Sequence, residues 1–137
     1  MYLHQRIRSV GEYAKTNVQT DLHSASPHRL IQMLMEGFLT HLNVAKGAVE
    51  HEDIAQKGEH ISRAIMILGG LEEGLDIEQG GEVAENLQGL YRYLRGRLLV
   101  ASKDNDAQVL SEVIGLMVDI KSAWDAIPDE FRHIGKQ

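Results

Sequence analysis

The sequence predicts an all-α protein: an antiparallel four-helix bundle with a short, mobile or docked N-terminal segment. Apolar residues recur at steps of three and four along four stretches of about 20 residues each, which is the helical period. No stretch shows the alternation typical of a half-buried strand. Short connections separate the four stretches, and short connections place consecutive helices antiparallel.

The first predicted helix begins at Ser26 and ends near Glu50. Ser26 is a favourable N-cap, because its hydroxyl can accept a hydrogen bond from a free amide of the first turn. Pro27 suits the first helical position, where its missing N–H costs nothing. The apolar stripe expected to join the core consists of Leu30, Ile31, Leu34, Phe38, Leu42, Ala45 and Val49.

The second and third predicted helices flank a glycine-rich stretch, "GGLEEGLDIEQGGE" at residues 69–82. Asp53 can cap the second helix, and the third begins near Glu82. The second stripe is Ile54, Ile61, Ala64, Ile65, Leu68 and Leu71. The third is Val83, Leu87, Leu90, Tyr91, Leu94 and Leu98.

The last predicted helix follows the turn "KDND" at residues 103–106, with Asp106 as its cap. Pro128 ends its pattern. Its stripe is Val109, Leu110, Val113, Ile114, Met117, Ile120, Trp124 and Ile127. The predicted organisation is therefore a docking segment over residues 1–25, a helical bundle over 26–128 and a tail over 129–137.

Composition excludes several classes of function. The chain has no cysteine, so disulfides, thiolate metal sites and thiol catalysis are ruled out. Its net charge of −6 does not favour a nucleic-acid partner. No apolar run approaches the roughly 18 residues that cross a bilayer, so we expect no membrane insertion and a soluble protein.

Catalytic and metal-binding patterns are weak. The Glu-x-x-His spacing of di-metal bundles occurs once, at Glu130 and His133, beyond Pro128. His51 and His60 lie among polar residues, whereas His41 projects near the middle of the first apolar face. We interpret His41 as a core residue with one hydrogen-bond partner. We therefore expect no enzyme activity, no metal and no cofactor.

The first helix carries more apolar residues than a core stripe needs. Met35 and Leu39 extend its apolar arc on one side, and Met33 and Val44 fall beyond the other edge. A core stripe needs little more than roughly 100° of the circumference. Apolar residues that project away from the other stripes are Met66, Ile67, Tyr93, Val100 and Val118. This surplus favours a groove that binds another helix.

The blocks "SPHRLIQMLMEG", "GGEVAENLQGLYRYL" and "NDAQVLSEVIGLMVDIKSAWDAI" resemble the flagellin-specific export chaperones of bacteria, the FliS family. The resemblance spans about residues 13–127. It implies a helical bundle in the bacterial cytosol, without enzyme activity, that binds the disordered C-terminal region of flagellin. Binding prevents premature polymerisation, and the chaperone delivers flagellin to the flagellar type III export apparatus.

The resemblance also implies a binding role for the N-terminal segment, since "VGEYAKTNV" looks like the family's tyrosine-containing segment. Together with the apolar surplus, the expected partner-binding residues are Val10, Tyr13, Met35, Leu39, Leu42 and Ile67. Two alternatives remain open at this stage. One is a regulatory adaptor for a flagellar gene regulator, and the other is a metal-binding bundle enzyme.

Overall fold

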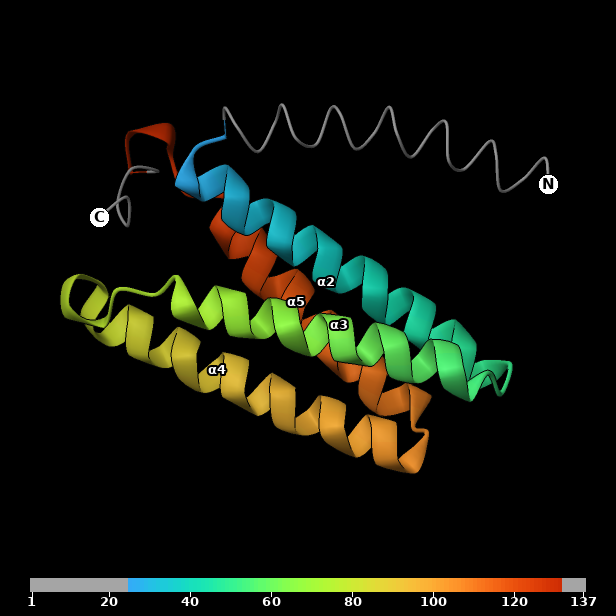
Figure 1. Ribbon diagram of the computed structural model, residues 1–137. Coiled ribbons are helices and arrows are strands. Elements are labelled where there is room, and N and C mark those ends of the chain that lie inside the picture. The colour runs from blue at the N-terminus through green and yellow to red at the C-terminus, as the bar shows by residue number, and fades with distance from the viewer. Residues whose placement is uncertain (1–24, 132–137) are drawn as a thin grey trace, which may run out of the picture.

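The computed structural model describes residues 25–131, and over this range the protein is an all-α bundle, as the sequence predicts (Figure 1). The helices are α2 (Pro27–Glu50), α3 (Ile54–Glu73), α4 (Ile77–Asp104) and α5 (Ala107–Asp125). A short 3-10 helix, η1 (Asp129–Phe131), follows. The predicted N-terminal segment, with Val10 and Tyr13, lies outside the described residues, so the division into segment, bundle and tail stays a prediction. No helix in residues 25–131 is long and apolar enough to cross a membrane.

The helices pack in a ring, each against the next along the chain, with α5 closing on α2. At one end, which we call the closed end, residues 51–53 link α2 to α3, and residues 105–106 link α4 to α5. At the other, the open end, residues 74–76 link α3 to α4, while α2 begins and α5 ends (Figure 1). Within residues 25–131, the open end therefore has one covalent turn between helices, and the closed end has two.

The predicted helix caps are confirmed. The Ser26 hydroxyl accepts a hydrogen bond from the Arg29 amide at 3.1 Å. The Asp53 carboxylate accepts one from the Gln56 amide at 3.1 Å, and Asp106 caps α5 in the same way. These contacts satisfy amides that have no partner within their own helix.

The glycine-rich stretch interrupts the helices less than predicted. Helix α3 runs through Gly69 and Gly70 to Glu73, and α4 begins at Ile77 rather than near Glu82. A glycine in a helix costs about 1 kcal/mol relative to alanine. Continuing α3 buries Leu71, which is 1% exposed, and this burial outweighs that cost. The break falls instead at Gly81, inside α4, whose φ of 54° and ψ of −131° favour glycine.

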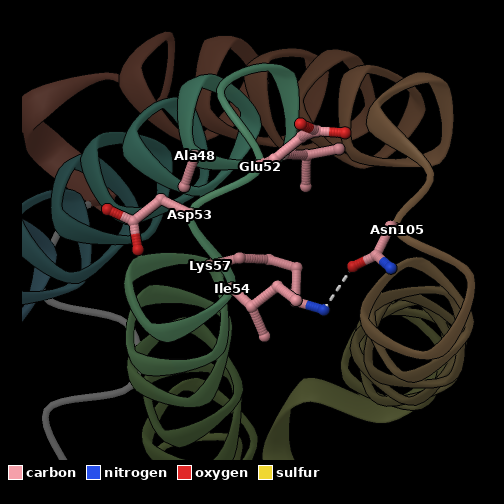
Figure 2. Close-up of a pocket in the computed structure, with 7 residues that line it drawn as sticks. Ala48, Glu52, Asp53, Ile54, Lys57 and Asn105 are labelled. Carbon is pink, nitrogen blue, oxygen red and sulfur yellow. Dashed lines mark hydrogen bonds between the residues drawn. The ribbon is translucent and has the colours of Figure 1, made fainter.

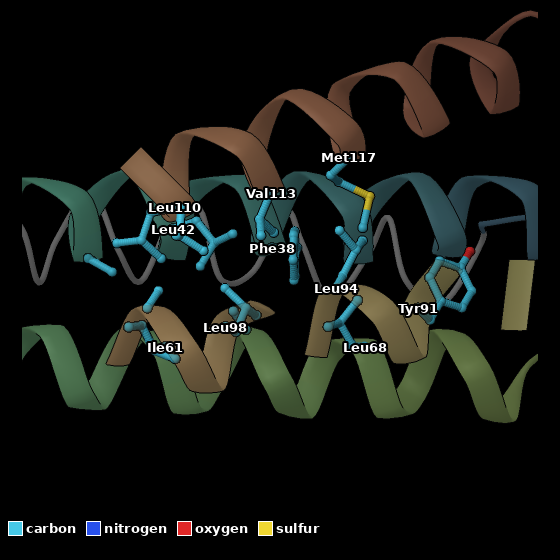
Figure 3. Packing of buried hydrophobic residues seen from close by; sticks show 14 of the residues in the cluster. Phe38, Leu42, Ile61, Leu68, Tyr91, Leu94, Leu98, Leu110, Val113 and Met117 are labelled. Carbon is cyan, nitrogen blue, oxygen red and sulfur yellow. The ribbon is translucent and has the colours of Figure 1, made fainter. Parts of the chain in front are cut away.

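One apolar core runs through all four helices (Figure 3). Phe38 and Leu42 of α2 point toward Leu94 and Leu98 of α4, and these four side chains are fully buried. Other core side chains include Met35, Ile61, Leu68, Tyr91, Leu110, Val113 and Met117. The four predicted stripes thus meet, but their first residues on α3 and α4, Ile54 and Val83, are each 68% exposed and lie outside the core. On α2 the buried line passes through Met35, Phe38 and Leu42 rather than through Leu34.

Candidate functional site

An apolar groove of about 310 Å³ opens on the surface at the open end of the bundle. It receives residues from every helix, because α2 begins here and α5 ends here. We call it the open-end groove. Its lining residues are Pro27, His28, Leu30, Ile31, Leu34, Leu71, Gly74, Leu75, Leu87, Tyr91 and Trp124.

The backbone around the groove depends on glycine. At Gly80, an added Cβ would lie 2.7 Å from the Cβ of Ala84, which is too close for any other residue without a shift. Gly81 next to it has the positive φ that kinks the start of α4. The Gly-Gly pair therefore sets the path of the first turn of α4, the turn that follows Leu75 of the groove lining.

A reciprocal contact between His28 and Trp124 fixes one wall of the groove. The His28 Nε2–H donates to the Trp124 carbonyl at 2.7 Å, and the Trp124 indole N–H donates to the His28 carbonyl at 3.0 Å. The two rings stack with their centroids 4.9 Å apart. His28 is 3% exposed, so its burial is matched by hydrogen bonds at both its ring and its backbone. The contact ties the first turn of α2 to the last turn of α5.

A polar cluster joins α2 to α5 outside the groove. Lys121 donates to Asp125 at 2.7 Å, and the Gln32 amide donates to the same carboxylate at 2.8 Å. These bonds, the Lys121 one first, lower the pKa of Asp125. Between α3 and α4, Glu72 pairs with Arg92 at 2.9 Å. An apolar centre flanked by such polar contacts is the usual composition of a protein-binding surface.

The groove is lined by few side chains that can titrate. Its titratable lining residues are His28 and Tyr91, and burial raises the pKa of Tyr91 to about 12, so its phenol stays neutral. Across residues 25–131, no group of three or more His, Cys, Asp or Glu side chains is placed to hold a metal ion. The arrangement is suited to receiving apolar side chains.

The structure corrects part of the predicted binding surface. Met35 was expected at an outer edge of α2, but its side chain is fully buried, and so is that of Leu42. Leu34, expected in the core, is instead partly exposed and lines the groove. The packing of α2 between α3 and α5 turns the Met35 side of the apolar arc inward and leaves Leu34 at its margin.

Leu39 and Ile67 are half-buried and pack against the core. Ile67 of α3 lies beside α2 at Gly37, where an added Cβ would be 3.5 Å from the Ile67 Cδ1. Neither residue lines the open-end groove. Of the apolar residues predicted to project outward, Val44, Met66, Tyr93, Val100 and Val118 are exposed.

None of the residues that line the groove was predicted as a binding residue, and Leu30, Ile31 and Leu34 of α2 were assigned to the core stripe. Leu75 follows Gly74 in the link between α3 and α4, and Leu87 and Trp124 were assigned wholly to core stripes. His28 carried one usable signal, since it follows Pro27 in the first turn of a helix, where a buried histidine needs a partner from another element. The partner, Trp124, is 96 residues away.

The fold and the groove define an all-α bundle whose open end is suited to receiving an amphipathic peptide segment. The chain belongs to the FliS family: the family model described as "Flagellar protein FliS" matches residues 9–130.

Three relatives illustrate the similarity. Flagellar secretion chaperone FliSB of Pseudomonas aeruginosa is 46% identical over 121 residues, covering 88% of this chain and 96% of the relative. Flagellar secretion chaperone FliS of Vibrio cholerae is 39% identical, covering 92% of this chain and 93% of that protein. The FliS chaperone of Salmonella typhimurium is 47% identical, covering 86% and 88%.

Proposed function

We propose that this chain is a flagellar secretion chaperone that binds the C-terminal segment of flagellin in the open-end groove. Membership of the FliS family supports the chaperone role. The observation that supports this location of the binding site is an apolar groove of about 310 Å³ that opens on the surface at the end where α2 begins. Burial of apolar surface stabilises such a complex by about 25 cal/mol per Å², before the cost of ordering the segment.

The binding mode that fits this groove is a helix or extended segment with an apolar stripe. Leu30, Ile31 and Leu34 present a row of aliphatic side chains along α2, and Leu87 of α4 faces the same space. A client stripe at positions i, i+3 and i+4 could pack along such a row. While bound, the client's apolar face is not available for polymerisation with other flagellin subunits.

The N-terminal segment is a competitor for the same groove in this proposal. Residues 1–24, including Val10 and Tyr13, lead directly into Ser26, and Pro27 and His28 are the first groove residues. A segment attached at the edge of a groove has a high effective concentration there. Deleting residues 1–12 should therefore increase the binding of a hydrophobic dye by the free protein. Unchanged dye binding would argue against a docked segment.

Membership of the FliS family also supports a proposal for the mode of action, the location and the delivery step. The chaperone acts by binding alone, without catalysis or a cofactor, in the bacterial cytosol, and it hands flagellin to the flagellar export apparatus. The relatives named above are secretion chaperones, so they favour this role over that of an adaptor for a flagellar gene regulator. A pull-down from cell lysate separates the two, since an adaptor would recover a regulator without flagellin.

Titration of the flagellin C-terminal peptide into Leu30→Glu protein tests the groove. Leu30 lines the groove without being among the side chains packed on the core, so a charge there should leave folding intact. It should weaken peptide binding about 30-fold or more, as expected at a well-packed contact centre. Met66→Glu is the matched control, because Met66 is an apolar residue on α3 that is 75% exposed and away from the groove.

A Leu39→Glu variant distinguishes the groove from the surface expected from the sequence. If Leu39→Glu abolishes binding while the protein melts normally, and Leu30→Glu binds normally, then the client occupies the surface near Leu39 and Ile67. Equal, unimpaired binding by both variants would place the site on another face.

A further inference from the structure

The outer side of α4 carries a regular line of exposed residues. Helix α4 packs against α3 and α5 at one edge of the bundle, so the side turned away from both faces solvent (Figure 1). After the kink at Gly81, residues on this side recur at alternating steps of four and three, which is the period of a coiled-coil seam. We call them the α4 outer line: Glu85, Gly89, Arg92, Gly96, Leu99 and Lys103, all of which are exposed.

The middle of this line combines one projecting apolar side chain with two flat positions. Leu99 is 58% exposed. At Gly89 and Gly96, an added Cβ would meet nothing within 4 Å, so packing within the described residues does not require glycine there. Both glycines lower the stability of α4 relative to alanine. Glycine on a helix surface does, however, allow another helix to approach closely.

The two ends of the line carry opposite charges without partners. Among residues 25–131, the side chains of Glu85 and Lys103 make no hydrogen bond or ion pair. Polar side chains between helices do find partners in the chain, as His41 of α2 does in His60 of α3, with their Nδ1 atoms 2.9 Å apart. His41 has the one partner that the sequence predicted, although it is half-buried rather than in the core. The charges of the α4 outer line are therefore available to another molecule.

We propose that the α4 outer line binds a second copy of this chain, with the two α4 helices antiparallel about a two-fold axis. When the axis lies level with Leu94, Glu85 of each copy is opposite Lys103 of the other. Leu99 of each copy is then opposite Gly89 of the other, where the missing side chain leaves room for it. The same surface thus supplies both halves of every contact, as a two-fold interface requires.

The arginines that meet near the axis are compatible with this arrangement. Arg92 of each copy lies opposite Gly96 of the other, so its stem can lie across a flat surface. The two Arg92 side chains approach each other, but each is paired with Glu72 of its own chain at 2.9 Å, which offsets their repulsion.

The outer side of α3 has the same spacing but the wrong charges. Its apolar residue, Met66, is 75% exposed, and Glu59 and Glu73 each lie two helical turns away from it, on either side. Two antiparallel copies of α3 would place these carboxylates opposite each other. A pairing of α3 with α4 would match only one of the two ends. Of the two helices, α4 alone is complementary to itself in charge.

The contact is small and leaves the open-end groove free. It uses one helix from each copy, so we expect a weak dimer with a Kd of about 100 µM. The protein is then a monomer at low micromolar concentrations. Leu87 and Tyr91 line the groove from the inward side of α4, so both copies keep an open groove.

Sedimentation equilibrium of the full-length protein at low salt, from about 5 to 500 µM, tests the contact. We expect a monomer–dimer equilibrium that Leu99→Glu weakens about 30-fold or more. Met66→Glu and the groove variant Leu30→Glu are the controls, and both should dimerise as the wild type does. A monomer at all concentrations would overturn the proposal, and so would a dimer that either control variant weakens as much as Leu99→Glu does.

Charge reversal tests the antiparallel register. Glu85→Lys places lysines opposite each other at both ends of the contact, and Lys103→Glu places glutamates there. Each variant alone should dimerise about 10-fold more weakly. An equimolar mixture should recover the wild-type affinity, because both ends then join opposite charges. Loss of folding cannot produce this recovery, and circular dichroism verifies the helix content of each variant. A mixture that dimerises as weakly as its components would show that the proposal is wrong.

Discussion

The two ends of the bundle differ in the number of turns that join their helices and in the polarity of their pockets. At the closed end, two tight turns join the helices in pairs, and a pocket of about 280 Å³ is lined partly by polar groups (Figure 2). At the open end, a single turn joins α3 to α4, and the groove is lined almost entirely by apolar side chains. The closed end is held by two covalent turns and by polar contacts of Lys57, whereas the open end relies on one turn and on side-chain contacts such as His28 with Trp124.

At the closed end, a buried lysine of α3 binds the C-terminal end of α4. Lys57 is 7% exposed, and its ammonium donates to the Ser102 carbonyl at 2.9 Å and to the Asn105 side chain (Figure 2). Both acceptors lie at the C-terminal end of α4, where the helix dipole favours a positive charge. Asn105 ends α4 in a left-handed conformation, with φ of 50°. The ammonium of Lys57 is thus satisfied by acceptors from α4 and its C-cap.

The largest expected effect concerns the border between core and groove on α2. Met35→Ala should destabilise the protein by about 2–5 kcal/mol, because Met35 is fully buried and alanine leaves a cavity. Leu34→Ala should cost only about 1 kcal/mol, since Leu34 is already partly exposed in the groove. Urea denaturation measures both. Equal losses, or a larger loss for Leu34, would reverse the assignment of inner and outer positions.

The second-largest expected effect is a loss of stability caused by a substitution at the closed end. Lys57→Met keeps the apolar stem but removes the ammonium from its two acceptors, so we expect a loss of about 1–3 kcal/mol in the free energy of unfolding. Lys103→Met is the control, because Lys103 is exposed in the last turn of α4 and contributes only through the dipole. Flagellin-peptide affinity should be the same in both variants. A loss of affinity in Lys57→Met would link the closed end to binding.

Local signals were sufficient for most of the fold. Ser26, Asp53 and Asp106 each act on amides within three residues, so their roles as caps can be inferred from the sequence. The start of α4 was placed near Glu82 because Gly80 and Gly81 were interpreted as part of a break between helices, whereas α4 begins at Ile77 and continues across a kink at Gly81. The limit of local signals also explains the exchange of Leu34 and Met35, which are 100° apart on a helical wheel at the two sides of one apolar arc. Only the positions of α3 and α5 decide which side is buried.

A smaller effect is expected from the wall of the groove. Trp124→Phe preserves an aromatic ring for stacking on His28 but removes the indole N–H that donates to the His28 carbonyl. We expect a loss of about 1 kcal/mol in stability. Because this contact ties α2 to α5 beside the groove, the affinity for the flagellin peptide should also fall, by a few-fold. Calorimetric titration measures the second effect. Unchanged affinity with reduced stability would confine the role of the contact to folding.

The smallest effect is electrostatic and depends on pH. The ammonium of Lys121, with help from the Gln32 amide, holds the pKa of Asp125 below its ordinary value of 3.8 in the folded protein. The ionised carboxylate therefore stabilises the fold fully above that ordinary value, and the contribution is lost as the pH falls from 3.8 through the lower folded value. Asp125→Asn should lower the Tm slightly at pH 7. The difference from the wild type should shrink as the pH falls below 3.8.

Asp119→Asn controls for the general effect of removing a negative charge from α5, since Asp119 is exposed on the same helix. Thermal melts from pH 7 to pH 2.5 at low salt compare the three proteins, and 0.5 M salt should reduce the Asp125 effect, because the ion pair is partly exposed. A gap between wild type and Asp125→Asn that persists at the lowest pH would mean that Asp125 holds α5 to α2 without its charge. The open end would then depend on neutral hydrogen bonding, as the wall formed by His28 and Trp124 does.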